Sequence, residues 1–336
     1  MKIAILGDGG WGTTLGILLS KKGYKVVIWG PFPKYLKVLD KKRENEKYLP
    51  KIKIPEEIEF EDNIKKATRG AKVIIVAIPS KFFRKVVKKL KNQIKKDQIL
   101  VSVAKGIEKK THKRMSEILE EELGKVKIGI LSGPNIAREI ALGMPAVSLV
   151  ASKNKKVAQF LQDVFFAKNF RVYLSNDILG VEIGGAFKNI IAIACGIADG
   201  LGFKDNTKAA ICVRGLVEME RLVKKLGGKK KTVYGIAGLG DLIVTSFSPL
   251  SRNRTLGEKI GQGKSLKEAI NEIARGKGSV IRGVVEGVET IQAIYQISKK
   301  LKIDMPITKA VWQILFQKKS PKEILEKLMQ RPKKAE

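Results

Sequence analysis

The hydrophobic positions follow two patterns, and the change between them divides the chain into two parts. In the first half, short runs of isoleucine, valine and leucine alternate with amphipathic stretches. Such runs predict strands buried on both faces, and their alternation with helices predicts a doubly wound parallel sheet. The strands that we predict are Ile3–Leu6, Lys25–Trp29, Val73–Ile78, Ile99–Val103, Ile128–Leu131, Val147–Val150 and Arg171–Leu174.

From about residue 180 onward the apolar positions take the spacing of helices. We therefore predict an α/β fold with two domains, a doubly wound domain over residues 1–178 and an all-helical domain over residues 179–336. The predicted helices are Val181–Leu201, Thr207–Leu226, Ser265–Ala274, Gly287–Leu301, Thr308–Gln317 and Pro321–Met329.

The first strand leads directly into a glycine-rich turn. Gly7, Gly9 and Gly12 form the pattern G-x-G-x-x-G, and an apolar helix pattern follows. Gly7 permits the tight turn, Gly9 lets the backbone approach a pyrophosphate, and Gly12 lets the helix pack against the sheet. The helix N-terminus then offers free N–H groups to the anion. Because the strand Lys25–Trp29 follows at the expected distance, we interpret the turn as the nucleotide loop of a Rossmann-type domain rather than a structural turn.

Composition favours a folded enzyme over a nucleic-acid-binding protein. Apolar residues make up 44% of the chain, which is typical of a protein with a packed core. The net charge of +33 would suit a polyanion, but the basic residues are spread over polar helix faces and aromatic residues make up only 6%. We therefore expect no nucleic-acid partner, although the positive field would attract an anionic substrate. A nucleic-acid-binding protein with a vestigial nucleotide domain is the alternative from another class.

The sequence also bears on the compartment. It holds no run of eighteen apolar residues, so we expect no transmembrane helix, and its first residues predict a strand rather than a signal peptide. Cys195 and Cys212 lie in apolar helical stretches without metal-ligand spacing, which predicts buried thiols in a reducing cytoplasm and no metal site.

The candidate proton donor is a lysine. The single histidine, His112, lies in a polar run, and we expect it to be exposed on a helix and not catalytic. Lys188 lies in the apolar stretch Val181–Ala198, where the other charged residue, Glu182, is six positions away and not an i,i+4 partner. Desolvation there would lower the pKa of Lys188 toward a value suited to proton transfer. A snorkelling or ion-paired structural lysine is the alternative.

Ligands bind beyond the carboxyl ends of parallel strands, which draws attention to the loops after the predicted strands. Lys105 ends one such strand, so it either binds substrate or faces solvent. Asn189 binds a substrate oxygen or satisfies a helix contact, and Asp241 orients Lys188 or caps a helix. The segment Ser251–Arg254 holds two guanidinium groups, which suits either a phosphate site or a solvated helix start.

Seven segments together resemble the NAD(P)-dependent glycerol-3-phosphate dehydrogenase family, in its order and spacing over nearly the whole chain. They are Gly7–Thr13, Ala104–Glu108, Leu131–Ala137, Gly180–Asn189, Gly238–Leu242, Ser251–Arg254 and Val284–Gly287. The resemblance implies an enzyme that reduces dihydroxyacetone phosphate to sn-glycerol 3-phosphate with NAD(P)H, a product that feeds glycerophospholipid synthesis. It also implies a two-domain homodimer.

The same resemblance implies residue roles. Lys188 is the general acid/base, and Lys105 contacts both substrate and cofactor. The substrate site is lined by Lys105, Gly133, Asn135, Asn189, Asp241, Thr245, Ser251, Arg252 and Asn253. The cofactor positions are Gly7, Gly9, Gly10, Trp11, Gly12, Lys105, Ala137, Arg252, Val284 and Glu286, and Gly133 and Asn135 match cofactor-contacting positions as well.

The chain departs from the family in two places. Gly10 and Asn135 stand where serine is usual. After the strand Lys25–Trp29, Gly30–Pro33 precede Lys34, whereas family members often carry basic residues suited to a 2′-phosphate directly after this strand. The acid that holds a 2′-hydroxyl in NAD-selective proteins is also absent there, so the choice between NADH and NADPH stays open. Among enzymes, the alternative is another lysine-dependent dehydrogenase of the 6-phosphogluconate or 3-hydroxyacid type.

Overall fold

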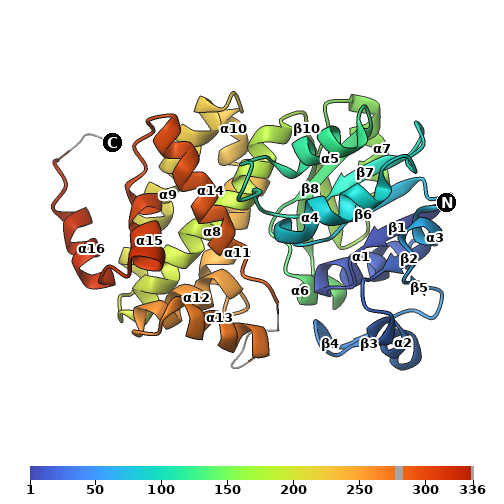
Figure 1. The fold of residues 1–336 in the computed structure, drawn as a ribbon, viewed down its shortest axis with the longest axis horizontal. Helices are drawn as coiled ribbons and strands as arrows, with labels where there is room; N and C mark the ends of the chain where they lie inside the picture. Colours follow the sequence, from blue (N-terminus) through green and yellow to red (C-terminus); the bar gives the residue numbers. More distant parts are fainter. Residues whose placement is uncertain (277–282, 334–336) are drawn as a thin grey trace.

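A computed structural model describes residues 1–276 and 283–333 (Figure 1). The first part of the chain forms an eight-stranded sheet in the order β10-β9-β8-β7-β6-β1-β2-β5, and β3 and β4 form a separate hairpin. The strands are β1 (Lys2–Leu6), β2 (Lys25–Trp29), β3 (Glu44–Asn45), β4 (Leu49–Lys53), β5 (Glu59–Glu61), β6 (Val73–Val76), β7 (Ile99–Ser102), β8 (Lys127–Ser132), β9 (Ala146–Ala151) and β10 (Phe170–Ser175).

Helices cover both faces of this sheet. Ile3 and Ile5 of β1 pack into the core under α1 and α7, while Ala4 and Leu6 point to the opposite face under α3, α4 and α5. The chain steps from β1 to β2 on one side and later to β6 on the other, so the ligand crevice is expected beyond the carboxyl ends of these strands. The helices of this part are α1 (Gly10–Ser20), α2 (Pro33–Lys42), α3 (Ile64–Thr68), α4 (Ser80–Val87), the 3₁₀ turn η1 (Lys88–Leu90), α5 (Met115–Leu123), α6 (Ala137–Ala141) and α7 (Lys155–Phe165).

One pairing corrects the expectation of a wholly parallel sheet. β8 and β9 are antiparallel, with Leu131 opposite Val150, while β9 and β10 are parallel to each other. The connection from β8 to β9 contains only the five-residue helix α6. That helix is about 7.5 Å long and cannot return the chain along β8, which spans about 20 Å. The chain therefore enters β9 from the end at which it left β8.

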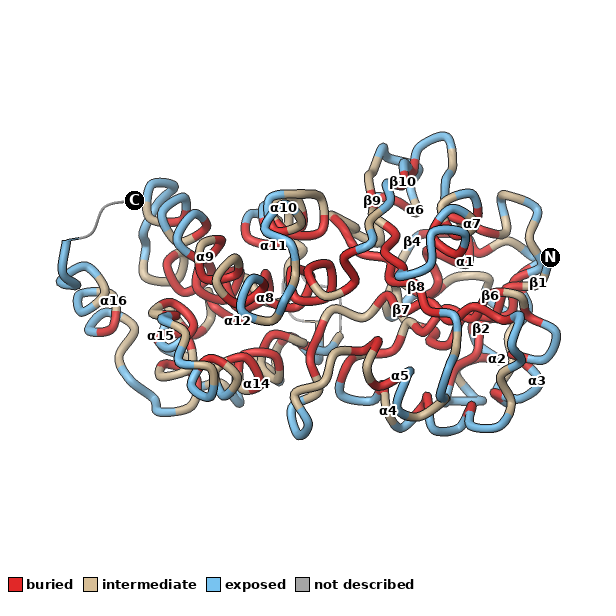
Figure 2. The backbone as a smooth tube through the Cα atoms, turned by 90° about the horizontal axis from the view of Figure 1, so that it is seen from above, coloured by how far each residue is buried: buried red, intermediate tan, exposed pale blue. Residues whose placement is uncertain are grey.

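The second part of the chain is helical and is built around α8. This 23-residue helix is buried along almost its whole length, as Figure 2 shows. It is long and apolar enough to cross a membrane, but 89% of its most apolar window is buried inside the fold, as in a core helix. The helices are α8 (Ile178–Gly200), α9 (Asp205–Lys225), α10 (Lys230–Val233), the π-helical turn η2 (Ile236–Gly240), α11 (Asp241–Phe247), α12 (Arg252–Gly261), α13 (Leu266–Arg275), α14 (Gly287–Lys300), α15 (Pro306–Gln317) and α16 (Pro321–Met329).

Close packing of α12 on α8 places the start of α12 beside the middle of α8. A β-carbon added to Gly257 would collide with the backbone carbonyl of Ile193, and one added to Gly196 would collide with that of Arg254. Side chains at these glycines would push the helices apart. The glycines therefore fix Arg252, the first residue of α12, relative to α8.

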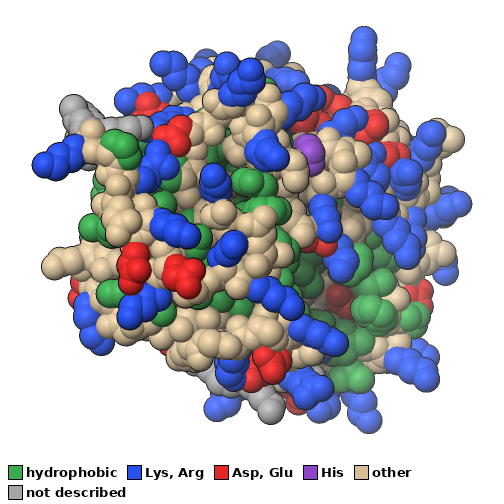
Figure 3. All heavy atoms as spheres, turned by 60° about the vertical axis from the view of Figure 1, so that its left-hand side comes forward, with side chains coloured by type: hydrophobic (Ala, Val, Ile, Leu, Met, Phe, Trp, Pro, Cys, Tyr) green, Lys and Arg blue, Asp and Glu red, His purple; other side chains and the backbone are tan. Residues whose placement is uncertain are grey.

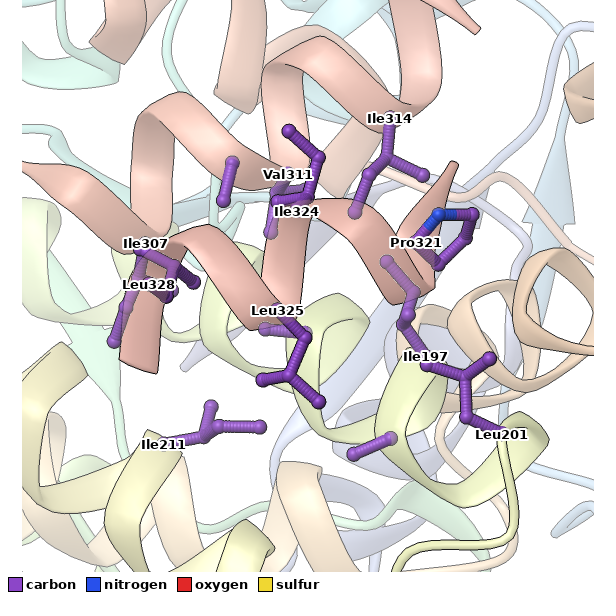
Figure 4. Close-up of a pocket in the computed structure, with 13 residues that line it drawn as sticks. Ile197, Leu201, Ile211, Ile307, Val311, Ile314, Pro321, Ile324, Leu325 and Leu328 are labelled. Carbon is purple, nitrogen blue, oxygen red and sulfur yellow. The ribbon is translucent and has the colours of Figure 1, made fainter. Parts of the chain in front are cut away.

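The last described helix covers an apolar pocket. Ile197 of α8, Ile211 of α9, Val311 of α15 and Leu325 of α16 are among the residues that line it (Figure 4). Almost all of its lining is hydrocarbon, so α16 is held by apolar contact. On the face shown in Figure 3, Lys and Arg side chains are spread over the surface with acidic groups among them, rather than gathered in one stripe.

Candidate active site

Lys188 lies on α8 and is only 6% exposed. Its Nζ donates a hydrogen bond of 2.7 Å to Thr245 Oγ1 and forms an ion pair with Asp241 Oδ1. Desolvation lowers the pKa of Lys188 to about 8, with Asp241 opposing this effect and Lys105 adding to it. Lys188 does not snorkel, because its ammonium is directed into the protein and not toward water. It is ion-paired, as the other half of the structural alternative expected.

Asp241 joins Lys188 to a second lysine. Its Oδ2 accepts a 2.7 Å hydrogen bond from Lys105 Nζ, and its side chain is completely buried. Gly240 is the N-cap residue of α11, so the interpretation of Asp241 as a helix cap is wrong. Lys105 Nζ also donates to the carbonyl of Gly133, at 2.7 Å. When both lysines are protonated, two ammonium groups share one carboxylate, and the cluster keeps a net positive charge that attracts an anion or a developing oxyanion.

A chain of amides holds this cluster to the neighbouring helices. Asn189 Nδ2 donates to the carbonyl of Lys105 at 3.1 Å, and Asn253 Nδ2 donates to Asn189 Oδ1 at 2.9 Å. The N–H of Gly287, the first residue of α14, donates to Asn253 Oδ1 at 3.0 Å. These three hydrogen bonds position the loop after β7 and helices α8, α12 and α14 relative to one another.

The two arginines of the Ser251–Arg254 segment have different surroundings. Ser251 is the N-cap of α12, and its Oγ accepts from the N–H of Arg254. The guanidinium of Arg254 is paired with Asp199 at 2.6 Å and Glu258 at 3.0 Å, so it is used structurally. Arg252 is exposed, and no carboxylate of the described residues lies within ion-pair distance of it. Of the two, only Arg252 is therefore available to an anionic ligand.

The glycine loop has the close packing that a dinucleotide site requires. Gly7 has φ = +130°, and a β-carbon on Gly12 would collide with the carbonyl of Gly7. Gly9 is the N-cap of α1, so the N–H groups of its first turn, including that of Trp11, are open to a ligand. A β-carbon on Gly10 would lie 2.6 Å from the carbonyl of Tyr48 in the β3–β4 hairpin, which explains glycine where serine is usual. These features fit a pyrophosphate.

The other positions predicted to contact the cofactor are Asn135, Ala137, Val284 and Glu286. Asn135 is bonded to β9, through Val147 O at 3.2 Å and Ser148 Oγ at 3.1 Å, and its side chain is occupied by these contacts. The carbonyl of Ala137 accepts from Thr14 of α1 at 3.1 Å. Glu286 Oε1 accepts from the N–H of Ser80 at the start of α4 at 3.2 Å, which joins the two parts of the chain, and Val284 near it is exposed.

The structure corrects the prediction for His112 and shows which groups Glu182 contacts in place of Lys188. His112 is half-buried in the turn before α5, with φ = +60°, and is not an exposed helix residue, because α5 begins only at Met115. Glu182 on α8 is bonded to Arg114 at 2.7 Å and to the N–H of Ser116 at 2.8 Å, partners that lie 66 or more positions away. Asp8 was not predicted as a site residue, although a carboxylate between two glycines of the loop is visible in the sequence.

Comparison with known proteins identifies the family. The sequence-family model of the NAD-dependent glycerol-3-phosphate dehydrogenase N-terminus matches residues 2–158. The family model of the C-terminus matches residues 177–326. The chain belongs to this family. A glycerol-3-phosphate dehydrogenase [NAD(P)+] of Clostridium tetani is 45% identical over 99% of this chain and 93% of its own, and one of Thermoanaerobacter is 45% identical over 100% and 99%.

Solved structures agree with this membership. The crystal structure of glycerol-3-phosphate dehydrogenase from Coxiella burnetii matches with a TM-score of 0.93 and 35% identity, covering 98% of this chain and 99% of that one. A ketopantoate reductase from Ralstonia eutropha, with a TM-score of 0.60 and 15% identity over 98% and 100%, shares the fold alone. The chain is thus an NAD(P)-dependent oxidoreductase of the glycerol-3-phosphate dehydrogenase type, and the predicted α/β fold with a helical second part is confirmed.

Proposed function

We propose that Lys188 is the general acid/base of this dehydrogenase. When bound, the reduced nicotinamide supplies the hydride that adds to C2 of dihydroxyacetone phosphate. As negative charge develops on the ketone oxygen, the Lys188 ammonium stabilises it and transfers a proton to it, which gives the alcohol of sn-glycerol 3-phosphate. The observation that carries this proposal is the buried ammonium held by Asp241 and Thr245, beside a second ammonium at Lys105.

We further propose that residues 1–178 hold most of the cofactor and that residues 179–336 hold the catalytic lysine and most of the substrate site. Val284 and Glu286 would reach the cofactor from the second part. Lys105 and Gly133 reach the cluster from the first part, while Lys188, Asn189 and Asp241 reach it from the second. The glycine loop and Ala137 would hold the pyrophosphate side of the cofactor, with Gly133, Asn135, Val284 and Glu286 toward its other end. Thr245, Ser251, Arg252 and Asn253 would surround the substrate.

Arg252 is proposed as the phosphate anchor, and its loss has a specific expected effect. Arg252→Ala should raise the KM for dihydroxyacetone phosphate at least about tenfold, since a charge-assisted hydrogen bond to phosphate is lost. Reduction of dihydroxyacetone, which lacks the phosphate, should change little. Steady-state loss of NADH absorbance with each ketone measures both, and Arg214→Ala, at an exposed position on α9, is the matched control. Equal losses on the two ketones would contradict the anchor role.

We propose that the enzyme is a homodimer. Val213 on α9 and Ile243 and Phe247 on α11 are large apolar side chains that are 44–50% exposed, and the two helices pack together. Large apolar side chains exposed on two adjoining helices are typical of an interface. Light scattering should give twice the 37.2 kDa of one chain, and Ile243→Glu should shift the mass toward one chain. A single-chain mass for the unmodified protein at micromolar concentration would count against the dimer.

A further inference from the structure

The carboxyl end of β2 lacks the side chain that sets cofactor choice in many Rossmann-type domains. An acid at this position accepts a hydrogen bond from the 2′-hydroxyl of the adenosine ribose in NAD-selective proteins, and an arginine nearby receives the 2′-phosphate in NADP-selective ones. Here β2 ends at Trp29 and is followed by Gly30, Pro31 and Phe32. Neither an acid nor a base therefore follows the strand directly.

A carboxylate from the glycine loop lies at this place instead. A β-carbon added to Gly30 would be 2.5 Å from Asp8 Oδ2 and 2.7 Å from Asp8 Cγ. The Asp8 side chain thus rests against the backbone at the end of β2. Glycine at position 30 is what allows this, because a larger side chain there would displace the carboxylate.

The Asp8 carboxylate is buried and incompletely satisfied. The residue is 8% exposed, and its Oδ2 has no hydrogen-bond partner among residues 1–276 and 283–333. A buried oxygen of this kind normally has a donor, so its absence within the described protein points to a donor from a ligand. Burial raises the pKa of Asp8, opposed by a hydrogen bond from its own backbone and by the charge of Lys47.

Neighbouring residues hold the backbone of Asp8 in place, and the charge of Lys47 acts on its carboxylate without forming an ion pair. Asn45 Nδ2 donates to the carbonyl of Asp8 at 2.9 Å and to Thr13 Oγ1 at 2.7 Å, which ties the glycine loop to the β3–β4 hairpin. Lys47 Nζ lies over the ring of Tyr48, 4.9 Å from its centroid, and over that of Tyr35 at 5.5 Å. The described residues form no ion pair with Asp8, so no direct partner compensates its negative charge.

We propose that Asp8 is the cofactor-specificity residue of this chain, accepting a hydrogen bond from the adenosine 2′-hydroxyl and repelling a 2′-phosphate, so that NAD(H) is preferred to NADP(H). A carboxylate is an acceptor for the hydroxyl, whereas a phosphate would place like charges together in a poorly solvated site. The chemistry usually supplied by the end of β2 is thereby supplied from the preceding loop. This inference rests on the cofactor class of the family and is independent of the role of Lys188.

Direct binding tests the proposal without turnover. Titration of the full chain with NADH and with NADPH, followed by nicotinamide fluorescence, should give a Kd for NADH at least about tenfold lower. Asp8→Ala should weaken NADH about tenfold and tighten NADPH, and Asp8→Asn, which keeps an acceptor without the charge, should tighten NADPH while NADH changes little. Glu61→Gln is the matched control, because Glu61 lies on β5 opposite Trp29 and should leave both constants unchanged.

Three results would overturn the proposal. One is equal affinity of the unmodified protein for the two cofactors. Another is an unchanged ratio of the two dissociation constants in Asp8→Ala, with far-ultraviolet circular dichroism confirming that the variant is folded. The third is a preference for NADPH that Lys47→Met abolishes, which would assign this place to the 2′-phosphate. Because neither measurement requires reduction of the ketone, failure here leaves the proposed proton transfer by Lys188 untouched.

Discussion

Lys188→Ala is expected to lower kcat for dihydroxyacetone phosphate reduction by at least about two orders of magnitude, the usual contribution of a positioned general acid. The alanine removes both the proposed proton donor and the ammonium that is bonded to Thr245 and Asp241. Water admitted to the vacated space is a much weaker acid than an ammonium group whose pKa is about 8. The affinity for NADH should change little, because the glycine loop that we assign to the cofactor lies on a different part of the chain.

Stopped-flow or steady-state loss of NADH absorbance measures this effect, and equilibrium titration measures NADH binding. Lys208→Ala provides a matched control, because Lys208 is a second buried lysine paired with a carboxylate, Asp199 at 3.0 Å, on a neighbouring helix. It should reduce stability without a comparable loss of kcat. A near-normal kcat in Lys188→Ala would refute the proposed role.

Asp241→Asn is expected to move the fall of kcat/KM with rising pH to a lower pH. In the proposed mechanism the protonated form of Lys188 reduces the substrate, so kcat/KM should be high below a pKa of about 8 and fall as the pH rises through it. Asp241 raises that pKa and Lys105 lowers it. With the carboxylate gone, only the lowering effects remain, and the fall should move to lower pH. A fall of about one unit in the pKa would lower the protonated fraction of Lys188 at pH 8, and with it kcat/KM, about fivefold.

The pH dependence of kcat/KM from about pH 6 to about pH 9.5 distinguishes this effect from a loss of folded protein. Asp199→Asn is the matched control, since Asp199 also bridges two cations, Lys208 at 3.0 Å and Arg254 at 2.6 Å. Both variants should be less stable, by about 3–5 kcal/mol if the cations stay buried without a partner. Only Asp241→Asn should shift the profile, and an unshifted profile would show that Asp241 does not tune Lys188.

Local patterns were sufficient for the elements that depend on local interactions. The continuous apolar runs identified β1 and β6, because strands buried on both faces need apolar residues throughout. The G-x-G-x-x-G spacing identified the nucleotide loop, because the turn, the close backbone approach and the helix packing each require glycine. The position of Lys188 on a long apolar helix predicted its burial, since that helix must be surrounded by others.

Short helices could not be predicted from the pattern of apolar positions alone. The π-helical turn at Ile236–Gly240 and the seven-residue α11 are too short to show a helical repeat, and isolated segments of this length are not stable helices. They form because both pack against α8, and the π-helical turn also packs against β9. The antiparallel direction of β9 also depended on how far α6 carries the chain, which the apolar run of β9 does not encode.

The sequence by itself determined the fold class, the family and the residues most suited to chemistry, because these follow from periodicity, glycine spacing and motifs. Only the tertiary structure decided which charges meet. Asp241 lies 53 positions from Lys188 and 136 from Lys105, yet its carboxylate is bonded to both. Asp8 likewise reaches the end of β2 only because the strands pair in parallel, with Leu6 opposite Trp29. Electrostatic interactions act through space, so the pKa values of this enzyme and the cofactor contact that we propose depend on distances that the order of residues does not contain.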